Sequence, residues 1–340
     1  MWTKEKMEKR IIRYADLVAC TNAFVDTRTP GSDKKENFTL IGPGVSENPE
    51  QYVHIKEKHG FNIGGARQPA HCINSQHSHI SAEVFLVHSG KWKMKFGVNA
   101  NEGSIEMNVG DVISIPTLMF RGFENIGNDI GFLFAVLGND NPGKVTWAPS
   151  VFEMAKDYGL ILLENGRLID TTLGEEIPEN VALEQPPTKE EIKALATPSA
   201  EKLSKCVVQD KDIQPNKNSP LHTDGVNECA VIVPTKTKDG FTDSPIQTWW
   251  QHGFNLRKLE IAPAKQTIWH AREEEEVIFV QEGALDIYWE EQNREDKITI
   301  NTGDTITVPK YLRRKFANNS LEGAQAFVVR GGDCPNMPLF

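Results

Sequence analysis

The 340-residue sequence lacks the features of several large classes of protein. No stretch approaches the roughly 18 consecutive apolar residues that a membrane-spanning helix needs. The first twenty residues intersperse Lys, Arg and Glu where a signal peptide would have an uninterrupted apolar segment. We therefore expect a protein with no membrane partner and a cytoplasmic location.

Paired cysteines and excess positive charge are also absent. Lys and Arg total 37 against 47 Asp and Glu, and the net charge of −10 argues against nucleic acid as a partner. The cysteines are odd in number, scattered and never arranged as CxxC, which indicates neither a disulfide framework nor a structural zinc site: Cys20, Cys72, Cys206, Cys229 and Cys334. What is present is a globular composition, long enough for two domains.

One sequence pattern occurs twice. Residues 77–140 align on residues 270–333 without a gap, at a constant spacing of 193 positions (270 − 77). A period of this length indicates two copies of one domain, because stacked repeats are about 20 to 50 residues long. The matched pairs include His77/His270, Glu83/Glu276, Gly90/Gly283, Gly110/Gly303, Asp111/Asp304, Pro116/Pro309, Arg121/Arg314, Asn125/Asn318 and Asp140/Asp333.

Each copy consists of short segments rich in aromatic and β-branched residues, separated by turns. Many short antiparallel strands predict an all-β fold, a sandwich or a barrel, with minor helices. We expect helices over residues 3–19 and 149–158, a hairpin over 160–170, and two short helices between the copies, one capped by Thr188 with Glu191. The proline-rich connection places the boundary near residue 187, giving domains 1–186 and 187–340.

His77, His79 and Glu83 are separated by two and four positions. Side chains alternate between the faces of a strand, so all three are expected to point into one barrel interior. Two histidines and a carboxylate suit a catalytic divalent metal that keeps coordination positions open for water and substrate.

The pattern HxHxxxExxxxxxG followed by GxxxxxPxxxxxxxxN resembles the two signature motifs of the cupin superfamily. The resemblance covers about residues 60–146 and 250–333, and it implies two tandem cupin barrels (double-stranded β-helix, or jelly-roll), with a metal inside the first. The motif positions in the first copy are His77, His79, Glu83 and Gly90, then Gly110, Pro116 and Asn125.

Both copies depart from the family at the fourth ligand. In metal-binding cupins a histidine stands five residues after the proline of the second motif, where this chain has Arg121 and Arg314. A guanidinium offers only donors and cannot bind a metal. The second copy also has Arg272 in place of its second histidine. We therefore predict a metal held by His77, His79 and Glu83 in the first barrel, and none in the second.

The positive charge of Arg121 suggests a role in the site. If its side chain enters the barrel, it is a catalytic residue that grips a substrate carboxylate with two parallel hydrogen bonds, with Arg67 adding charge at the mouth. Phe85 and Trp92 are expected to line the substrate cavity or to belong to the core. The alternative is that Arg121 pairs with Glu83 and no metal binds.

The two-barrel organisation and the length resemble bicupin dioxygenases that open gentisate-type rings. The resemblance implies an Fe(II) dioxygenase acting on a small carboxylated substrate, for which an aromatic compound is one candidate, and a homodimer or larger homo-oligomer. Mn(II), Ni(II) and Zn(II) are alternative metals, because these ligands suit several ions. Two other functions stay open: a non-redox metal-dependent lyase or isomerase, with His71 as its base, or a metal-free protein that binds a small anion or is structural.

Overall fold

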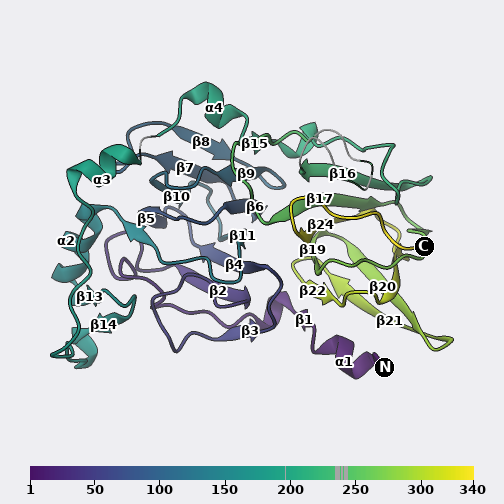
Figure 1. Ribbon diagram of the computed structural model, residues 1–340, viewed down its shortest axis with the longest axis horizontal. Helices are drawn as coiled ribbons and strands as arrows, with labels where there is room; N and C mark the ends of the chain where they lie inside the picture. The colour runs from purple at the N-terminus through teal and green to yellow at the C-terminus, as the bar shows by residue number, and fades with distance from the viewer. Residues whose placement is uncertain (196, 234–237, 239, 241–243) are drawn as a thin grey trace. The chain divides into compact units, whose positions relative to one another are not determined.

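A computed structural model of the chain describes residues 1–195, 197–233, 238, 240 and 244–340. Its strands group into two units, one comprising Val18–Val207 and the other Val208–Phe340 together with Met1–Leu17 (Figure 1). Both units are built from β-sheets, which confirms the predicted all-β class with minor helices. None of the described helices is long and apolar enough to span a membrane.

The Val18–Val207 unit has two principal sheets, which form two layers in Figure 1. One sheet has the order β15-β9-β6-β11-β4-β2-β3 and the other the order β12-β5-β10-β7-β8. The strands are β2 (Glu36–Ile41), β3 (Val53–Ile55), β4 (Phe61–Gln68), β5 (Ile73–Ser78), β6 (Glu83–Ser89), β7 (Trp92–Phe96), β8 (Ser104–Met107), β9 (Val112–Ile115), β10 (Arg121–Asn125), β11 (Gly131–Gly138), β12 (Thr146–Trp147) and β15 (Val207–Val208).

The turn at Gly90 connects the two layers. Its φ of +84° favours glycine, and an added Cβ would lie 2.7 Å from the Cα of Gly131. After this turn burial alternates along β7: Trp92, Met94 and Phe96 are buried, and the lysines between them are partly exposed. The glycine thus allows the tight turn by which the chain passes from β6 in one sheet to β7 in the other.

The helical and hairpin predictions for this unit are confirmed. Helix α2 covers Pro149–Asp157, and strands β13 (Leu160–Leu162) and β14 (Leu168–Asp170) form the expected hairpin, followed by the 3₁₀ turn η2 (Thr171–Leu173). Helix α3 (Lys189–Ala194) begins with a capping box, in which Glu191 N donates to Thr188 Oγ1 at 3.2 Å and Thr188 N donates to Glu191 Oε2 at 2.7 Å. Helix α4 (Ala200–Ser204) follows.

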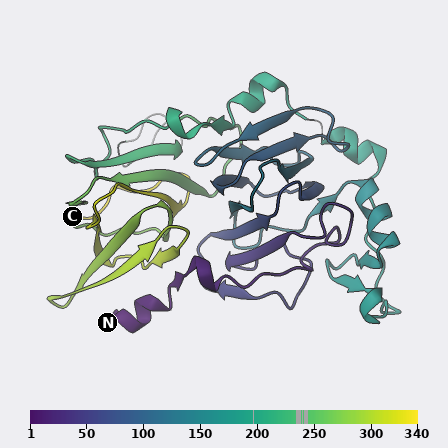
Figure 2. The same cartoon turned by 180° about the vertical axis from the view of Figure 1, so that it is seen from behind.

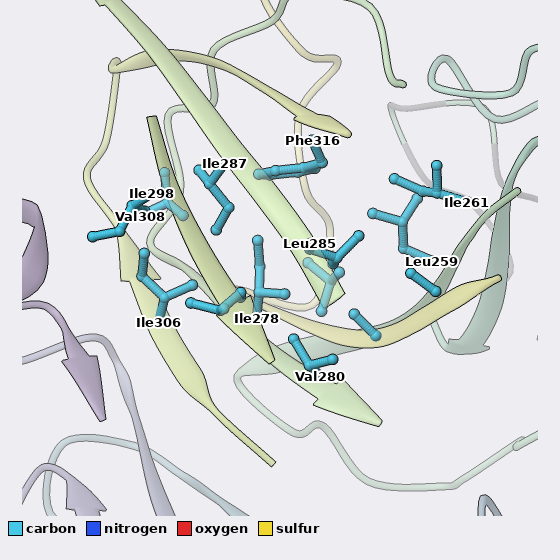
Figure 3. Packing of buried hydrophobic residues seen from close by; sticks show 14 of the residues in the cluster. Leu259, Ile261, Ile278, Val280, Leu285, Ile287, Ile298, Ile306, Val308 and Phe316 are labelled. Atoms are coloured by element: carbon cyan, nitrogen blue, oxygen red, sulfur yellow. The ribbon is translucent and has the colours of Figure 1, made fainter. Parts of the chain in front are cut away.

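The second unit repeats this arrangement with a sheet ordered β1-β22-β19-β24-β17-β16 and a sheet ordered β18-β23-β20-β21. Apolar side chains such as Ile278, Leu285 and Phe316 gather between its strands (Figure 3). Its elements are α1 (Lys4–Glu8), β1 (Ile11–Ile12), η1 (Tyr14–Asp16), η3 (Asp210–Asp212), β16 (Val226–Ile232), β17 (Phe254–Ile261), β18 (Lys265–Gln266), β19 (Glu276–Glu282), β20 (Ala284–Glu291), β21 (Arg294–Asn301), β22 (Thr305–Val308), β23 (Arg313–Asn318) and β24 (Ala324–Gly331).

The N-terminal segment differs from the prediction of a helix over residues 3–19. Helix α1 ends at Glu8, and the β-branched pair Ile11–Ile12 instead forms strand β1, antiparallel to β22. Met7 is fully buried in the core of the second unit, and Figure 2 shows this purple segment beside the yellow-green strands. The units therefore divide differently from the predicted domains 1–186 and 187–340, because residues 1–17 group with the C-terminal barrel and residues 187–207 with the N-terminal one.

The strands preserve the 193-residue repeat. Strands β4, β6, β9 and β11 correspond in length and position to β17, β19, β22 and β24. The cross-strand pairing is preserved as well: His77 pairs with Arg121, and His270 forms the equivalent bridge to Arg314. The repeat therefore begins upstream of residue 77, at Phe61 and Phe254.

Candidate metal centre

His77, His79 and Glu83 meet inside the N-terminal barrel. One ligand atom from each lies within 4.8 Å of the others, and all three residues are buried. The even spacing suggested that they share one strand, but they do not. His77 lies in β5, which ends at Ser78, and His79 follows just past its end. The chain then turns at the exposed Ile80, and Glu83 begins β6 in the other sheet.

The His77 ring is oriented by the backbone behind it. Its Nδ1 lies 2.7 Å from the carbonyl oxygen of Ser75, so the proton resides on Nδ1 and Nε2 is left to bind a metal. Burial, followed by the charge of Arg121, holds the pKa of His77 well below its usual range, and the same two causes lower the pKa of His79. Both rings are therefore neutral at pH 7, as metal ligation requires.

His79 and Glu83 face each other at a distance suited to a shared ion. His79 Nε2 lies 3.7 Å from Glu83 Oε1, too far for a hydrogen bond, and His79 Nδ1 is buried without a hydrogen-bond partner among the described residues. Two ligands of one metal stand about 3.0–3.4 Å apart when each bond is about 2.1 Å long. The residues present therefore fit a divalent metal after small side-chain movements.

Arg121 is directed at Glu83 and does not line the cavity described below. Its Nε donates to Glu83 Oε2 at 3.1 Å, its Nη2 also donates to Oε2, and its Nη1 donates to the carbonyl oxygen of His77 at 3.2 Å. This is the pairing that the sequence left as an alternative to a substrate contact. Because both carboxylate contacts use Oε2, Oε1 is left facing His79.

A buried ion pair supports His77 from behind, and sequence reasoning missed it. Lys35 and Asp26 are inaccessible and paired, and Lys35 Nζ donates to Asn74 Oδ1 at 2.9 Å. Asp26 Oδ2 accepts from Ser75 N at 3.0 Å, so the pair fixes the strand that orients His77. Neither charge lies in a motif, and only the tertiary structure brings residues 26 and 35 to β5.

The three ligand side chains line a cavity enclosing about 660 Å³ of empty space, counted with its opening. Phe85 lines this cavity, together with Phe24, Phe123 and Trp147. No lysine or arginine among the described residues contributes to the lining.

Two of the predicted substrate residues lie elsewhere. Trp92 belongs to the hydrophobic core, where its Nε1 donates to Ser89 O at 2.9 Å. Arg67 pairs with Glu36 at 2.5 Å and lies over the Phe38 ring. Arg67 itself does not line the cavity, although Phe38 does, and its role at the mouth stays a prediction.

The second barrel has arginines where a metal would sit. Glu276 accepts from Arg314 Nη2 at 2.6 Å and from Arg330 Nε at 2.8 Å, so both of its oxygens are occupied. Burial alone would raise the pKa of Glu276, but Arg314 and Arg330 hold it well below its usual range. Arg272, which replaces the second histidine, donates to Asn336 O at 2.9 Å.

A fold of two β-barrels, each with the same motif positions turned inward, defines a double-barrel protein of the cupin type. Family models agree: one described as Cupin matches residues 66–160, and one described as Cupin domain matches residues 257–330. The chain belongs to the cupin superfamily and is a bicupin.

Solved structures show the same fold at low identity. Oxalate decarboxylase from Bacillus subtilis at pH 4.6 is 10% identical, with a TM-score of 0.57, covering 96% of this chain and 77% of the other. The formate complex of the Lactobacillus farciminis oxalate decarboxylase is 11% identical, with a TM-score of 0.58, covering 96% and 87%. The likeness concerns the fold alone. No curated protein matches the sequence significantly.

Proposed function

We propose that this bicupin is a metal-dependent enzyme of the non-redox lyase type, with a divalent metal held by His77, His79 and Glu83. The observation that carries the proposal is the convergence of two neutral, buried histidines and one carboxylate on a cavity. When bound, the metal would supply a Lewis acid for an anionic group of the substrate. Mn(II), Ni(II), Zn(II) and Fe(II) all suit the ligand set.

The lyase proposal replaces the dioxygenase expectation. The structures that share the fold are named oxalate decarboxylases, a name that describes loss of a carboxyl group rather than incorporation of dioxygen. His71 is not suited to be the base, because its side chain is 75% exposed and it does not line the cavity. The chain's own contribution is then to orient a small anionic substrate at the metal and to exclude water with apolar walls.

Metal analysis tests the proposal. Protein purified without chelators should retain close to one equivalent of Mn(II), Fe(II), Ni(II) or Zn(II) when each is offered in turn. His77→Ala should abolish retention, and the matched His270→Ala in the second barrel should leave it intact. Retention below about a tenth of an equivalent for every ion would overturn the proposal.

A turnover assay separates the two reaction classes. Substrate loss without O₂ consumption supports a lyase, whereas stoichiometric O₂ consumption would restore the dioxygenase. The cytoplasmic location and the homo-oligomeric state stay predictions, the second being checked by light scattering of the purified protein.

The Arg121–Glu83 pair favours a second candidate function, a metal-free protein that binds a small molecule or is structural. The pair already satisfies one carboxylate oxygen without an ion. Under this alternative the metal analysis gives no retention for the native chain, and His77→Ala binds cavity ligands as the native chain does.

A further inference from the structure

Aromatic rings form part of the wall of the N-terminal cavity. Phe85 and Phe123 form an edge-to-face pair with centroids 5.2 Å apart, and Phe24 and Trp147 form another at 5.8 Å. The Trp147 ring also lies 5.2 Å from the His77 ring. Apolar ring surface therefore extends up to the proposed metal ligands, and a flat apolar ligand would pack against it there.

Two polar atoms on the described wall have no hydrogen-bond partner, His79 Nδ1 and one on β2. Asn37 on β2 lines the cavity, and its Nδ2 is buried without a hydrogen-bond partner among the residues that the structure describes. Buried amide groups are ordinarily hydrogen-bonded, because leaving one unpaired is costly. A ligand oxygen that accepts from Nδ2 would satisfy this group.

The charge of the lining limits what else the ligand can carry. Arg121 is engaged with Glu83 and does not line the cavity, and Lys35 is engaged with Asp26 and Asn74. The proposed metal would therefore be the one positive centre facing the described part of the lining. A second carboxylate that does not also bind the metal would be buried beside aromatic rings without a counter-charge, which is strongly unfavourable.

From these three observations we infer that the substrate is an aromatic compound with one anionic, metal-binding group and an uncharged oxygen that accepts from Asn37, rather than a compound with a second carboxylate away from the metal. The inference rests on the proposed metal site for the anionic group. The ring and the Asn37 contact depend only on the chain.

Binding to the Mn(II)-loaded protein tests the ring and the single charge. Calorimetric titrations with benzoate, acetate and terephthalate, with metal content measured afterwards, compare the same carboxylate with and without a ring and with a second charge that cannot reach the metal. Benzoate should bind at least about tenfold more tightly than acetate, given the apolar area of a phenyl ring. Equal binding of benzoate and acetate, or tighter binding of terephthalate than of benzoate, would overturn the inference.

A second experiment in metal-free protein keeps this inference separate from the metal proposal. Asn37→Leu should weaken phenol binding about five- to tenfold, the value of one hydrogen bond, and leave toluene binding within about twofold. Asn101→Leu, at an exposed position, is the matched control. Unchanged phenol affinity in Asn37→Leu contradicts the assigned contact. Failure to retain metal refutes the proposed function alone, because phenol and toluene need no metal.

Discussion

Arg121 and a bound metal compete for Glu83, and replacing Arg121 by methionine tests this competition. Methionine keeps much of the length of the side chain and removes the charge and the donors. Arg121 is 1% exposed and Glu83 5%, so the variant leaves a buried carboxylate without the cation that contacts it. Breaking a buried pair in this way costs about 3–5 kcal/mol. The metal-free variant should lose this much free energy of unfolding.

The metal-bound variant should lose much less, because a divalent ion would compensate the charge of Glu83 and both carboxylate oxygens would be available to it. By thermodynamic linkage, whatever part of the 3–5 kcal/mol the metal restores appears as tighter metal binding. Full restoration corresponds to roughly a hundredfold to a few thousandfold in affinity. We expect a gain of at least about tenfold, since methionine also perturbs the packing.

Urea unfolding with and without Mn(II), together with chelator competition for the metal, measures both quantities. Arg67→Met is the control, because its pair with Glu36 is partly exposed at 28% and 34%; it should cost about 0–1 kcal/mol and leave metal affinity unchanged. The competition is refuted if Arg121→Met loses stability and metal affinity together. That result would show that Arg121 stabilises the metal site and does not compete with the metal for Glu83.

Three further predictions concern the surroundings of the site. Metal affinity measured by chelator competition should change less than about twofold between pH 7.5 and 6, because burial keeps the pKa of His77 and His79 low. Protonation of two histidines with ordinary pKa values would lower the affinity about fourteenfold over this range. A drop of that size would contradict the lowered pKa values. Lys35→Met should lower the free energy of unfolding measured in urea by about 3–5 kcal/mol and weaken metal binding about tenfold. Adding Asp26→Asn should recover part of the stability, because it removes the unpaired charge. No recovery would refute a stabilising ion pair between Lys35 and Asp26. Glu276→Gln should cost a similar 3–5 kcal/mol while metal content stays unchanged, and loss of the metal would place a metal in the second barrel.

Local patterns predicted those parts of the fold that depend on local interactions. The capping box at Thr188 and the hairpin over 160–170 need only neighbouring residues, and both are present. Residues 3–19 have a helical pattern, but Ile11 and Ile12 pair with Thr305 and Ile306, nearly 300 positions away. A pairing at that separation overrides a weak helical propensity and leaves no trace in a local window.

In the candidate site, too, the sequence predicted the residues that motif spacing determines and missed the contacts that depend on tertiary structure. The motif spacing located His77, His79 and Glu83 and marked Arg121 at the position of a fourth ligand. The pairing of Arg121 with His77 across β5 and β10 came from the structure. Spacing does not specify the direction of a long flexible side chain, so the expected substrate contact of Arg121 was instead an ion pair with Glu83. Asp26 and Lys35 were invisible for a further reason: the segment carrying them lies outside the repeated motifs.

The same repeat register shows how the second barrel differs from the first at the positions that line the cavity. Gly64 and Leu137 line the cavity of the first barrel, and the positions 193 residues later are Arg257 and Arg330, both fully buried. The cross-strand pairing is preserved, because Leu137 pairs with Asn62 as Arg330 pairs with Asn255. Long charged side chains thus enter the second barrel where the first has a glycine and a leucine, and Arg330 takes up one oxygen of Glu276. These differences occupy an oxygen of Glu276 and alter the space a substrate would need, which is why we propose the chemistry for the N-terminal barrel alone.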